Sequence, residues 1–468
     1  MVIRGVPDRL AKDGWWLDDA PDRRFLSVWL LFGVVLCADL FLWRAIPGLG
    51  VAVWFLTIAG AAHLALGRSV SAKRAVASWS VLVVALLPAV DLVQALSIGL
   101  ALLGLTAFAA LLIVPVTVPS KVLHTIWRLP FFGVAQTCKD GRTIRFPAPP
   151  AGTFLALVRD WLVPLTVGAL FVGLLAMANP LVDAWLARLQ AMDARLTWDP
   201  ARILFWAIAA LAVWPMLRLN RMVARLIKPT RPLPALRSGL VTARSTLRAL
   251  VLFNIIFAVQ SVLDAGYLWG GIALPEGMTY AEYAHRGAYP LLVAALLAGA
   301  FALIAQPFLT DRPVLRVLLY VWIGQTVLLV FSSILRLDLY VEAYGLTRLR
   351  FAAFIWMTVT ALGLVLMIMQ MIGRQSIGWF TLRAAGLALL ALYAVSLINV
   401  DGFIARHNLA AGKVDVSYLC DLSEGATPAL RAHAKHCGRI STPSDWREWG
   451  FRNARLRRSL ASMNEVQG

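Results

Sequence analysis

The sequence predicts an all-α, polytopic membrane protein with about 11 transmembrane helices, and three observations support this fold class. Hydrophobic residues make up 60% of the 468-residue chain, well above the roughly 45–50% apolar content of a soluble domain. Charged residues make up only 15%. The apolar residues form long runs, and about 20 of them in a row are enough for a helix to cross a bilayer. We therefore expect lipid to cover much of this protein.

The elements follow one another as a polar N-terminal segment, two groups of spans and a polar tail. Residues 1–24 are polar, and no cleavage site follows the first apolar run, so that run is predicted to remain in the membrane as an anchor. About six spans are expected within 25–217, at 25–43, 51–66, 75–90, 96–114, 161–179 and 203–217. About five more are expected within 250–399, at 250–269, 289–309, 314–335, 351–372 and 379–399. Pro88 and the short connection at Asp91 leave a re-entrant hairpin as an alternative for the third and fourth spans.

The distribution of Lys and Arg predicts the orientation. With residues 1–24 in the cytoplasm, the cytoplasmic segments hold 26 Lys and Arg, and the short external loops hold 8. Positively charged loops are retained on the cytoplasmic side. We therefore expect a multi-pass protein of the bacterial inner membrane, with a cytoplasmic N-terminus and a small extracytoplasmic tail over 400–468, in the periplasm.

Two cytoplasmic loops, 121–159 and 218–249, carry much of the formal net charge of +19. Basic residues beside spans fix topology and contact anionic lipid headgroups. A membrane protein partner that docks on these loops is the alternative. We expect no nucleic-acid binding, because no basic patch is accompanied by a recognisable binding motif.

Polar residues inside the second group of spans form two helical faces. Asn254, Gln260 and Asp264 share one face of the seventh span, and Gln325 and Arg336 share one face of the ninth. An ion pair between Asp264 and Arg336 is sterically possible. Such groups either hold helices together by hydrogen bonds or line a polar cavity that opens outward. A single His63 in an apolar span is expected to be a hydrogen-bonded core residue.

Two external loops add further polar residues to the candidate site. Thr279 begins a capping box, so a short surface helix is expected to start at Tyr280 and to present Glu282, His285 and Arg286. In the loop 335–350, Gly345 suits a turn and Thr347 can cap the tenth span. The complete candidate polar site is Asn254, Gln260, Asp264, Glu282, His285, Arg286, Gln325 and Arg336. Glu282 and His285 could share a proton-transfer task, but no nucleophile, phosphate-loop or zinc-protease motif supports catalysis.

The tail contains two of the four cysteines. Cys420 and Cys437 would both lie in an oxidising compartment, which favours a disulfide. A metal site with His433 and His436 is the alternative, but the spacing fits no strong zinc pattern, so we expect no metal and no cofactor. Cys37 and Cys138 are expected to be free thiols. A final helix is expected over 443–460.

Several motifs of the second half resemble a bacterial family of multipass membrane proteins. The matching segments are 253–260, 274–290, Tyr344-Gly345-Leu346-Thr347, Ile404-Ala-Arg-His-Asn408, Asp415-Val-Ser-Tyr-Leu419 and Pro428-Ala-Leu430. They resemble the group known as domain of unknown function 4173, which is related to the 4153 group. The resemblance covers about 247–430 and implies a bacterial inner-membrane location, without an activity or catalytic residues.

These observations favour transport or handling of a small molecule or envelope component through an outward-facing polar site. A sensory or scaffold partner of a signalling or envelope complex is the first alternative. A membrane-embedded enzyme is the second and is less favoured.

Overall fold

The computed structural model describes residues 24–66, 70–115, 117–143, 199–227, 242–269, 280–308, 312–431 and 442–467. Within these ranges the regular secondary structure is helical, with no strand, so the all-α fold class is confirmed. Eight described helices are long and apolar enough to cross a membrane, and the shorter apolar segments Leu26–Leu42 and Pro290–Ala305 match two further predicted spans. The predicted span 161–179 lies outside the described residues.

The chain divides into two compact units, which are described separately. Unit 1 comprises residues 1–84 and 103–228, and unit 2 comprises 85–102 and 229–468. Helices α4 (Ala72–Asp91) and α5 (Ala95–Ile113) contribute to both units. They contain 20 and 19 residues, or about 30 Å at 1.5 Å per residue. Both are thus long enough to span, which favours two spans over a re-entrant hairpin.

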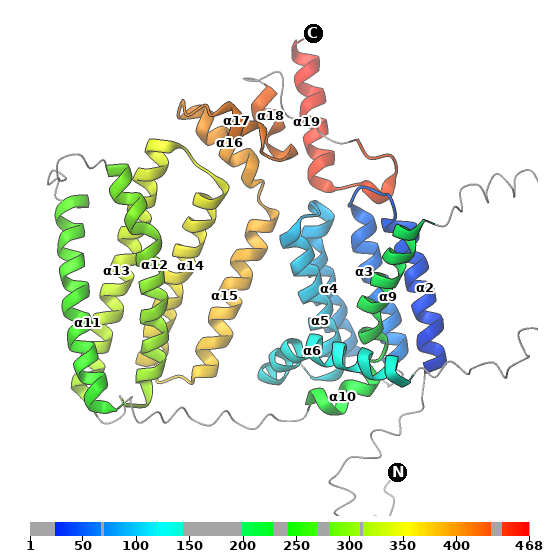
Figure 1. Cartoon of the computed structure of the whole chain (residues 1–468), viewed down its shortest axis with the longest axis horizontal. Coiled ribbons are helices and arrows are strands. Elements are labelled where there is room, and N and C mark those ends of the chain that lie inside the picture. Colours follow the sequence, from blue (N-terminus) through cyan, green and yellow to red (C-terminus); the bar gives the residue numbers. More distant parts are fainter. Residues whose placement is uncertain are drawn as a thin grey trace, which may run out of the picture. The chain divides into compact units, whose positions relative to one another are not determined.

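Unit 1 is built on α9, which contacts α2, α3 and α6. Helix α6 runs across the direction of the other three (Figure 1). The described helices of unit 1, apart from α4 and α5, are α2 (Arg24–Leu42), α3 (Leu49–Leu66), α6 (Pro119–Thr143), α9 (Pro200–Leu217) and α10 (Leu219–Ile227). The basic segment starting at residue 121 was expected to be a loop, but its first part forms α6. This helix is amphipathic and carries several charges, so a search for long apolar runs does not detect it.

Charges inside unit 1 are paired. At one end of α9, Arg202 donates to both carboxylate oxygens of Asp39, at 2.8 and 2.5 Å. At the other end, Asp140 of α6 accepts hydrogen bonds from Trp214 and Arg218, each at 3.0 Å. Because a buried charge is costly unless it is paired, these bonds account for the acidic residues in the apolar surroundings.

Elsewhere in the structure, Trp79 Nε1 donates to His63 Nδ1 at 3.3 Å. His63 is therefore hydrogen-bonded, as expected.

Unit 2 contains a bundle in which α13 contacts α11, α12 and α14, and α14 also contacts α15 (Figure 1). Its helices are α11 (Ala243–Asp264), the π-helix η2 (Ala265–Trp269), α12 (Tyr280–Ala305), the 3₁₀-helix η3 (Gln306–Phe308), α13 (Pro313–Tyr344), α14 (Arg348–Ile372) and α15 (Ile377–Leu397). The Trp322 ring lies at the centre of the core, stacked on Phe253 at a centroid distance of 5.2 Å and in edge contact with Phe301.

Two helices of unit 2 are longer than predicted. The ninth span was expected to end at 335, but α13 continues to Tyr344 and ends at Gly345, which has a φ of 77°. The charged residues after Leu335 end the apolar run without ending the helix. Helix α12 begins at Tyr280, as predicted, but continues through Pro290 into the span instead of forming a separate surface helix. Interior prolines are tolerated in membrane helices because neighbouring groups satisfy the freed backbone.

The tail of unit 2 folds into short helices around a small apolar core. They are α16 (Val400–Ala410), α17 (Val416–Cys420), the 3₁₀-helix η4 (Glu424–Ala426) and α18 (Thr427–Arg431), and they are followed by the 3₁₀-helix η5 (Trp446–Glu448) and the longer α19 (Phe451–Gln467). The core joins Ile404, Leu419 and Leu430 to Val341 of α13. The predicted start of the final helix at 443 is wrong: Asp445 caps only the short turn η5, and Trp449 is extended before α19 starts.

The cysteines separate into two kinds. Cys420 is disulfide-bonded, whereas Cys37 and Cys138 are free thiols, as expected. Cys437, the predicted partner of Cys420, lies outside the described residues.

Candidate functional site

The predicted polar faces of α11 and α13 meet inside unit 2. Arg336 donates to Asp264 in an ion pair whose side chains are only 4% and 2% exposed. Gln260 Nε2 also donates to Asp264 at 2.8 Å, and Asn254 Nδ2 donates to the carbonyl oxygen of Leu318 at 3.0 Å. The bonds of Arg336 and Asn254 join α13 to α11, whereas the Gln260 bond lies within α11. Bonds between helices are the arrangement expected of polar groups that stabilise helix packing.

The rest of the predicted site is not brought into this network by any described contact. Gln325 lies on α13 and is partly buried. Glu282, His285 and Arg286 belong to the first turns of α12, but their side chains lie outside the described part of the structure.

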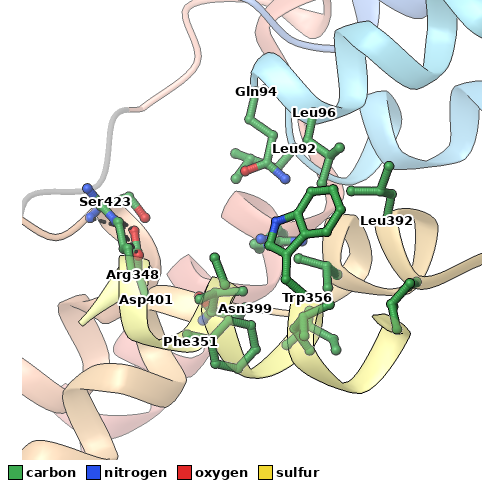
Figure 2. Close-up of a pocket in the computed structure, with 18 of the residues that line it drawn as sticks. Leu92, Gln94, Leu96, Arg348, Phe351, Trp356, Leu392, Asn399, Asp401 and Ser423 are labelled. Atoms are coloured by element: carbon green, nitrogen blue, oxygen red, sulfur yellow. Dashed lines mark hydrogen bonds and ion pairs between the residues drawn. The ribbon is translucent and has the colours of Figure 1, made fainter. Parts of the chain in front are cut away.

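A pocket of about 530 Å³ lies elsewhere in unit 2 (Figure 2). It is formed by the first turns of α14, the last turns of α15, the start of α16 and the α4–α5 connection. Its apolar lining is Leu92, Val93, Leu96, Phe351, Ala352, Ile355, Trp356, Val359, Ala388, Ala391, Leu392, Val395, Ile398 and Val400. Its polar lining is Gln94, Arg348, Asn399, Asp401, Ser423 and Arg452. The volume lies within the range of about 300–1,000 Å³ found for small-molecule sites.

Part of the polar lining lies apart from the apolar residues, whereas Gln94 lies beside Leu92 and Asn399 beside Phe351 (Figure 2). Figure 2 shows the Trp356 ring near Leu96 and Leu392, whereas Arg348, Asp401 and Ser423 cluster away from it. The pocket therefore has an apolar part and a distinct polar end.

A bidentate ion pair forms the polar end. Arg348 Nε donates to Asp401 Oδ1 at 2.7 Å, and Arg348 Nη2 donates to Oδ2 at 2.6 Å. The backbone N–H of Ser423 donates to Asp401 Oδ2 at 2.9 Å. Burial works to raise the pKa of Asp401, but the hydrogen bonds from Arg348 and Ser423 outweigh it and lower that pKa. The Arg348 side chain remains 50% exposed, so the pair is charged and accessible.

The residues of the family-like motifs hold Arg348 in place. Asn408 Oδ1 accepts from the N–H of Leu346 at 2.7 Å, and Asn408 Nδ2 donates to the Leu346 carbonyl at 2.9 Å. The Tyr418 hydroxyl accepts from the N–H of Arg348 at 2.8 Å. A Cβ at Gly345 would lie 3.2 Å from Asn408 Oδ1, and its positive φ also favours glycine. The motifs therefore fix the start of α14 against the tail.

A second ion pair of the pocket, this one buried, lies beside the α4–α5 connection. Arg452 of α19 donates to Asp91 Oδ2 through Nε at 2.9 Å and through Nη2 at 2.5 Å. Its Nη2 also donates to the Ser396 carbonyl at 2.8 Å. Each arginine at the pocket is thus matched by one aspartate, and these four charges sum to zero.

This chemistry suits binding better than catalysis. Both oxygens of Asp401 already accept hydrogen bonds, and its lowered pKa makes it a weak base near neutral pH. Among the described residues, no group of three or more His, Cys, Asp or Glu side chains is placed to hold a metal ion. What the pocket offers is apolar surface beside a fixed donor–acceptor pair.

Sequence reasoning placed the loop 335–350 and the tail on one side of the membrane but did not detect the pocket. Its walls come from residues 92–96 and 348–452, which are far apart in the sequence. Arg348 and Asp401 do lie at the ends of two predicted spans. Opposite charges at neighbouring span ends were the sequence signal that could have identified this ion pair.

One comparison with known proteins gives a match. A family model described as "Domain of unknown function (DUF4153)" matches residues 51–433. This is the 4153 group, and the match extends well beyond 247–430 into the first half of the chain. Every pocket residue except Arg452 falls within it. Neither the curated proteins nor the solved structures contain a significant match.

Proposed function

Since the chain belongs to the family of the domain of unknown function DUF4153, a membership that assigns no activity, we propose a function from the pocket itself. The protein binds an amphiphile, with its hydrocarbon part against Trp356 and the alanine-lined wall of α15 and its polar head at the Arg348–Asp401 pair. The observation that carries this proposal is the separation of a mainly apolar pocket from a single accessible ion pair.

The position of the pocket supports a ligand drawn from the membrane. Its walls are the first turns of α14 and the last turns of α15, two apolar helices long enough to span. The ends of spans lie at the headgroup layer. A ligand that places its head there and its chain along the spans would have to move only a short distance from the bilayer into the pocket.

The charge balance indicates the kind of head. Asp401 neutralises Arg348, and Asp91 neutralises Arg452. A strongly anionic head would gain little from such paired arginines. A zwitterionic or uncharged polar head can instead accept from the exposed guanidinium and donate to the carboxylate or to Ser423. We therefore propose a lipid-like ligand without net charge.

The cellular role follows from the orientation that the Lys and Arg distribution predicts. With the tail in the periplasm of a bacterial cell, the pocket takes its ligand from the outer leaflet of the inner membrane. The proposed role is handling or transport of an envelope component or its precursor. The basic loops then face the cytoplasm, where contact with anionic headgroups is part of the same proposal.

The test compares two variants of one helix. Ala391→Phe fills the pocket, whereas Ala394→Phe places the same side chain on an exposed position of α15 that does not line it. Purified full-length protein is incubated with mixed micelles containing a zwitterionic phospholipid, and bound lipid is counted by native mass spectrometry. We expect the wild type and Ala394→Phe to retain the lipid and Ala391→Phe to lose it, by about tenfold in affinity.

Two results would contradict the proposal. Equal lipid retention by both variants would show that lipid binds outside the pocket. A preference for an anionic phospholipid over the zwitterionic one would contradict the assignment of the head.

A further inference from the structure

Helix α6 of unit 1 has three distinct faces, and one of them is apolar and exposed. Leu123, Trp127, Phe131 and Val134 are all exposed, and Trp127 is 73% exposed. At 100° per residue these four side chains fall within an arc of about 80°. Cys138, a free and exposed thiol, lies in the same arc. We propose that α6 lies in the plane of the membrane interface and inserts this face into a leaflet that contains anionic lipid.

The opposite face fixes the helix against unit 1. Thr125, Leu129, Gln136 and Asp140 are buried, and α6 contacts both α9 and α10. Asp140 accepts from Gln136 as well as from Trp214 and Arg218 of α9 and its C-cap. A Cβ at Gly133 would lie 2.9 Å from Pro215. These contacts prevent α6 from rotating to hide its apolar side, so that side needs an occupant outside the unit.

The third face is basic. Lys121, Arg128 and Lys139 fall within an arc of about 20° by the same rule. The Arg128 guanidinium lies 4.7 Å from the centre of the Phe132 ring. Asp140, the single acidic residue of α6, is on the buried face. The surface presented outward is therefore apolar on one side and uniformly positive beside it.

This combination identifies lipid as the occupant. Helices that lie in a membrane interface have a large aromatic or aliphatic face and Lys or Arg beside it. In addition, α6 runs across the direction of α2, α3 and α9 (Figure 1), so its apolar face does not continue the side of a span. Basic residues at such a surface attract anionic lipids, each by about fivefold.

The native thiol provides the test. In a Cys37→Ala variant of the full chain, Cys138 is labelled with an environment-sensitive fluorophore, and Cys138→Ser in the same background measures labelling elsewhere. The protein is placed in nanodiscs of phosphatidylcholine alone or with phosphatidylglycerol. Quenching by a lipid with a nitroxide just below its headgroup is compared with quenching by aqueous iodide.

We expect strong quenching by the lipid nitroxide, weak quenching by iodide and a further shift towards lipid quenching when phosphatidylglycerol is present. The triple variant K121Q/R128Q/K139Q should abolish the dependence on phosphatidylglycerol. The variant R406Q/K413Q/R458Q removes the same charge from exposed residues of the C-terminal tail and should retain the dependence on phosphatidylglycerol.

Two results would overturn the inference. Iodide quenching without lipid quenching would show that the face is open to water and available to a protein partner instead. Lipid quenching that is equally dependent on phosphatidylglycerol in both triple variants would show that α6 is not the anionic-lipid surface.

Discussion

The buried ion pair between α11 and α13 gives the sharpest test of how this bundle is stabilised. Arg336→Met removes one partner and leaves the Asp264 carboxylate buried, with a side-chain exposure of 2%. Removing one member of a buried pair typically costs about 3–5 kcal/mol, whereas replacing both with apolar residues is often neutral or stabilising. The double variant Arg336→Met/Asp264→Leu also removes the acceptor of Gln260, which costs about 1–3 kcal/mol. We therefore expect the single variant to lose about 3–5 kcal/mol and the double variant to recover part of that loss.

Equilibrium unfolding in mixed micelles, followed by tryptophan fluorescence, measures both values. Arg348→Met is the matched control, because it breaks an ion pair of the same type in which the arginine is 50% exposed. Because solvent reaches this arginine while Asp401 is 12% exposed, we expect Arg348→Met to cost more than the roughly 1 kcal/mol of a surface pair but clearly less than Arg336→Met. If Arg336→Met were no more destabilising than Arg348→Met, the pair would not hold α11 and α13 together. A double variant that recovers none of the loss would contradict the cost assigned to the unpaired Asp264 carboxylate.

Three further predictions concern the tail and the orientation. Asn408→Ala removes both side-chain bonds to Leu346. It should lower the midpoint of unfolding and weaken lipid retention measured by native mass spectrometry. Unchanged retention would contradict the positioning of α14 by Asn408. The pKa of Asp401 is lowered from 3.8 in the folded chain, so its contribution to stability is fully present above pH 3.8 and is lost as the pH falls through the lower folded value. Unfolding of Asp401→Asn should accordingly differ from the wild type equally at pH 5 and pH 8, and a difference that disappears between these values would refute the assignment. Finally, Lys413→Cys lies on an exposed part of the tail and should react with a membrane-impermeant maleimide in intact spheroplasts; protection until lysis would place the tail in the cytoplasm.

The spans were predictable because each depends on a local property of the sequence. A run of about 20 apolar residues has few alternatives to a membrane helix, and ten of the eleven predicted segments coincide with described apolar helices. Capping was predictable for the same reason: the Thr347 side chain accepts from the N–H of Arg350 at the start of α14. The end of α13 was not predictable from hydropathy, since polar residues such as Asp338 and Glu342 continue the helix beyond the apolar run.

The pocket and α6 depend on contacts between distant segments. In the sequence, Trp356 cannot be distinguished from an interfacial tryptophan, and only the structure places residues 92–96 in the same pocket. The residues buried on α6 are recognisable only once α9 and α10 are packed against them. Motif residues such as Asn408 and Tyr418 could be identified as distinctive, but their role in fixing Arg348 required their hydrogen bonds.

Helix α13 has a mechanical consequence for the whole of unit 2. Its 32 residues extend about 48 Å at 1.5 Å per residue, whereas the hydrocarbon layer is about 30 Å thick. Leu319 lies in the core of the bundle and Val341 in the core of the tail. One continuous helix, α13, therefore contributes to both cores. A force applied to the tail is therefore transmitted as a tilt of α13 among its neighbours. Because they share one continuous helix, we expect the tail and the bundle to unfold together.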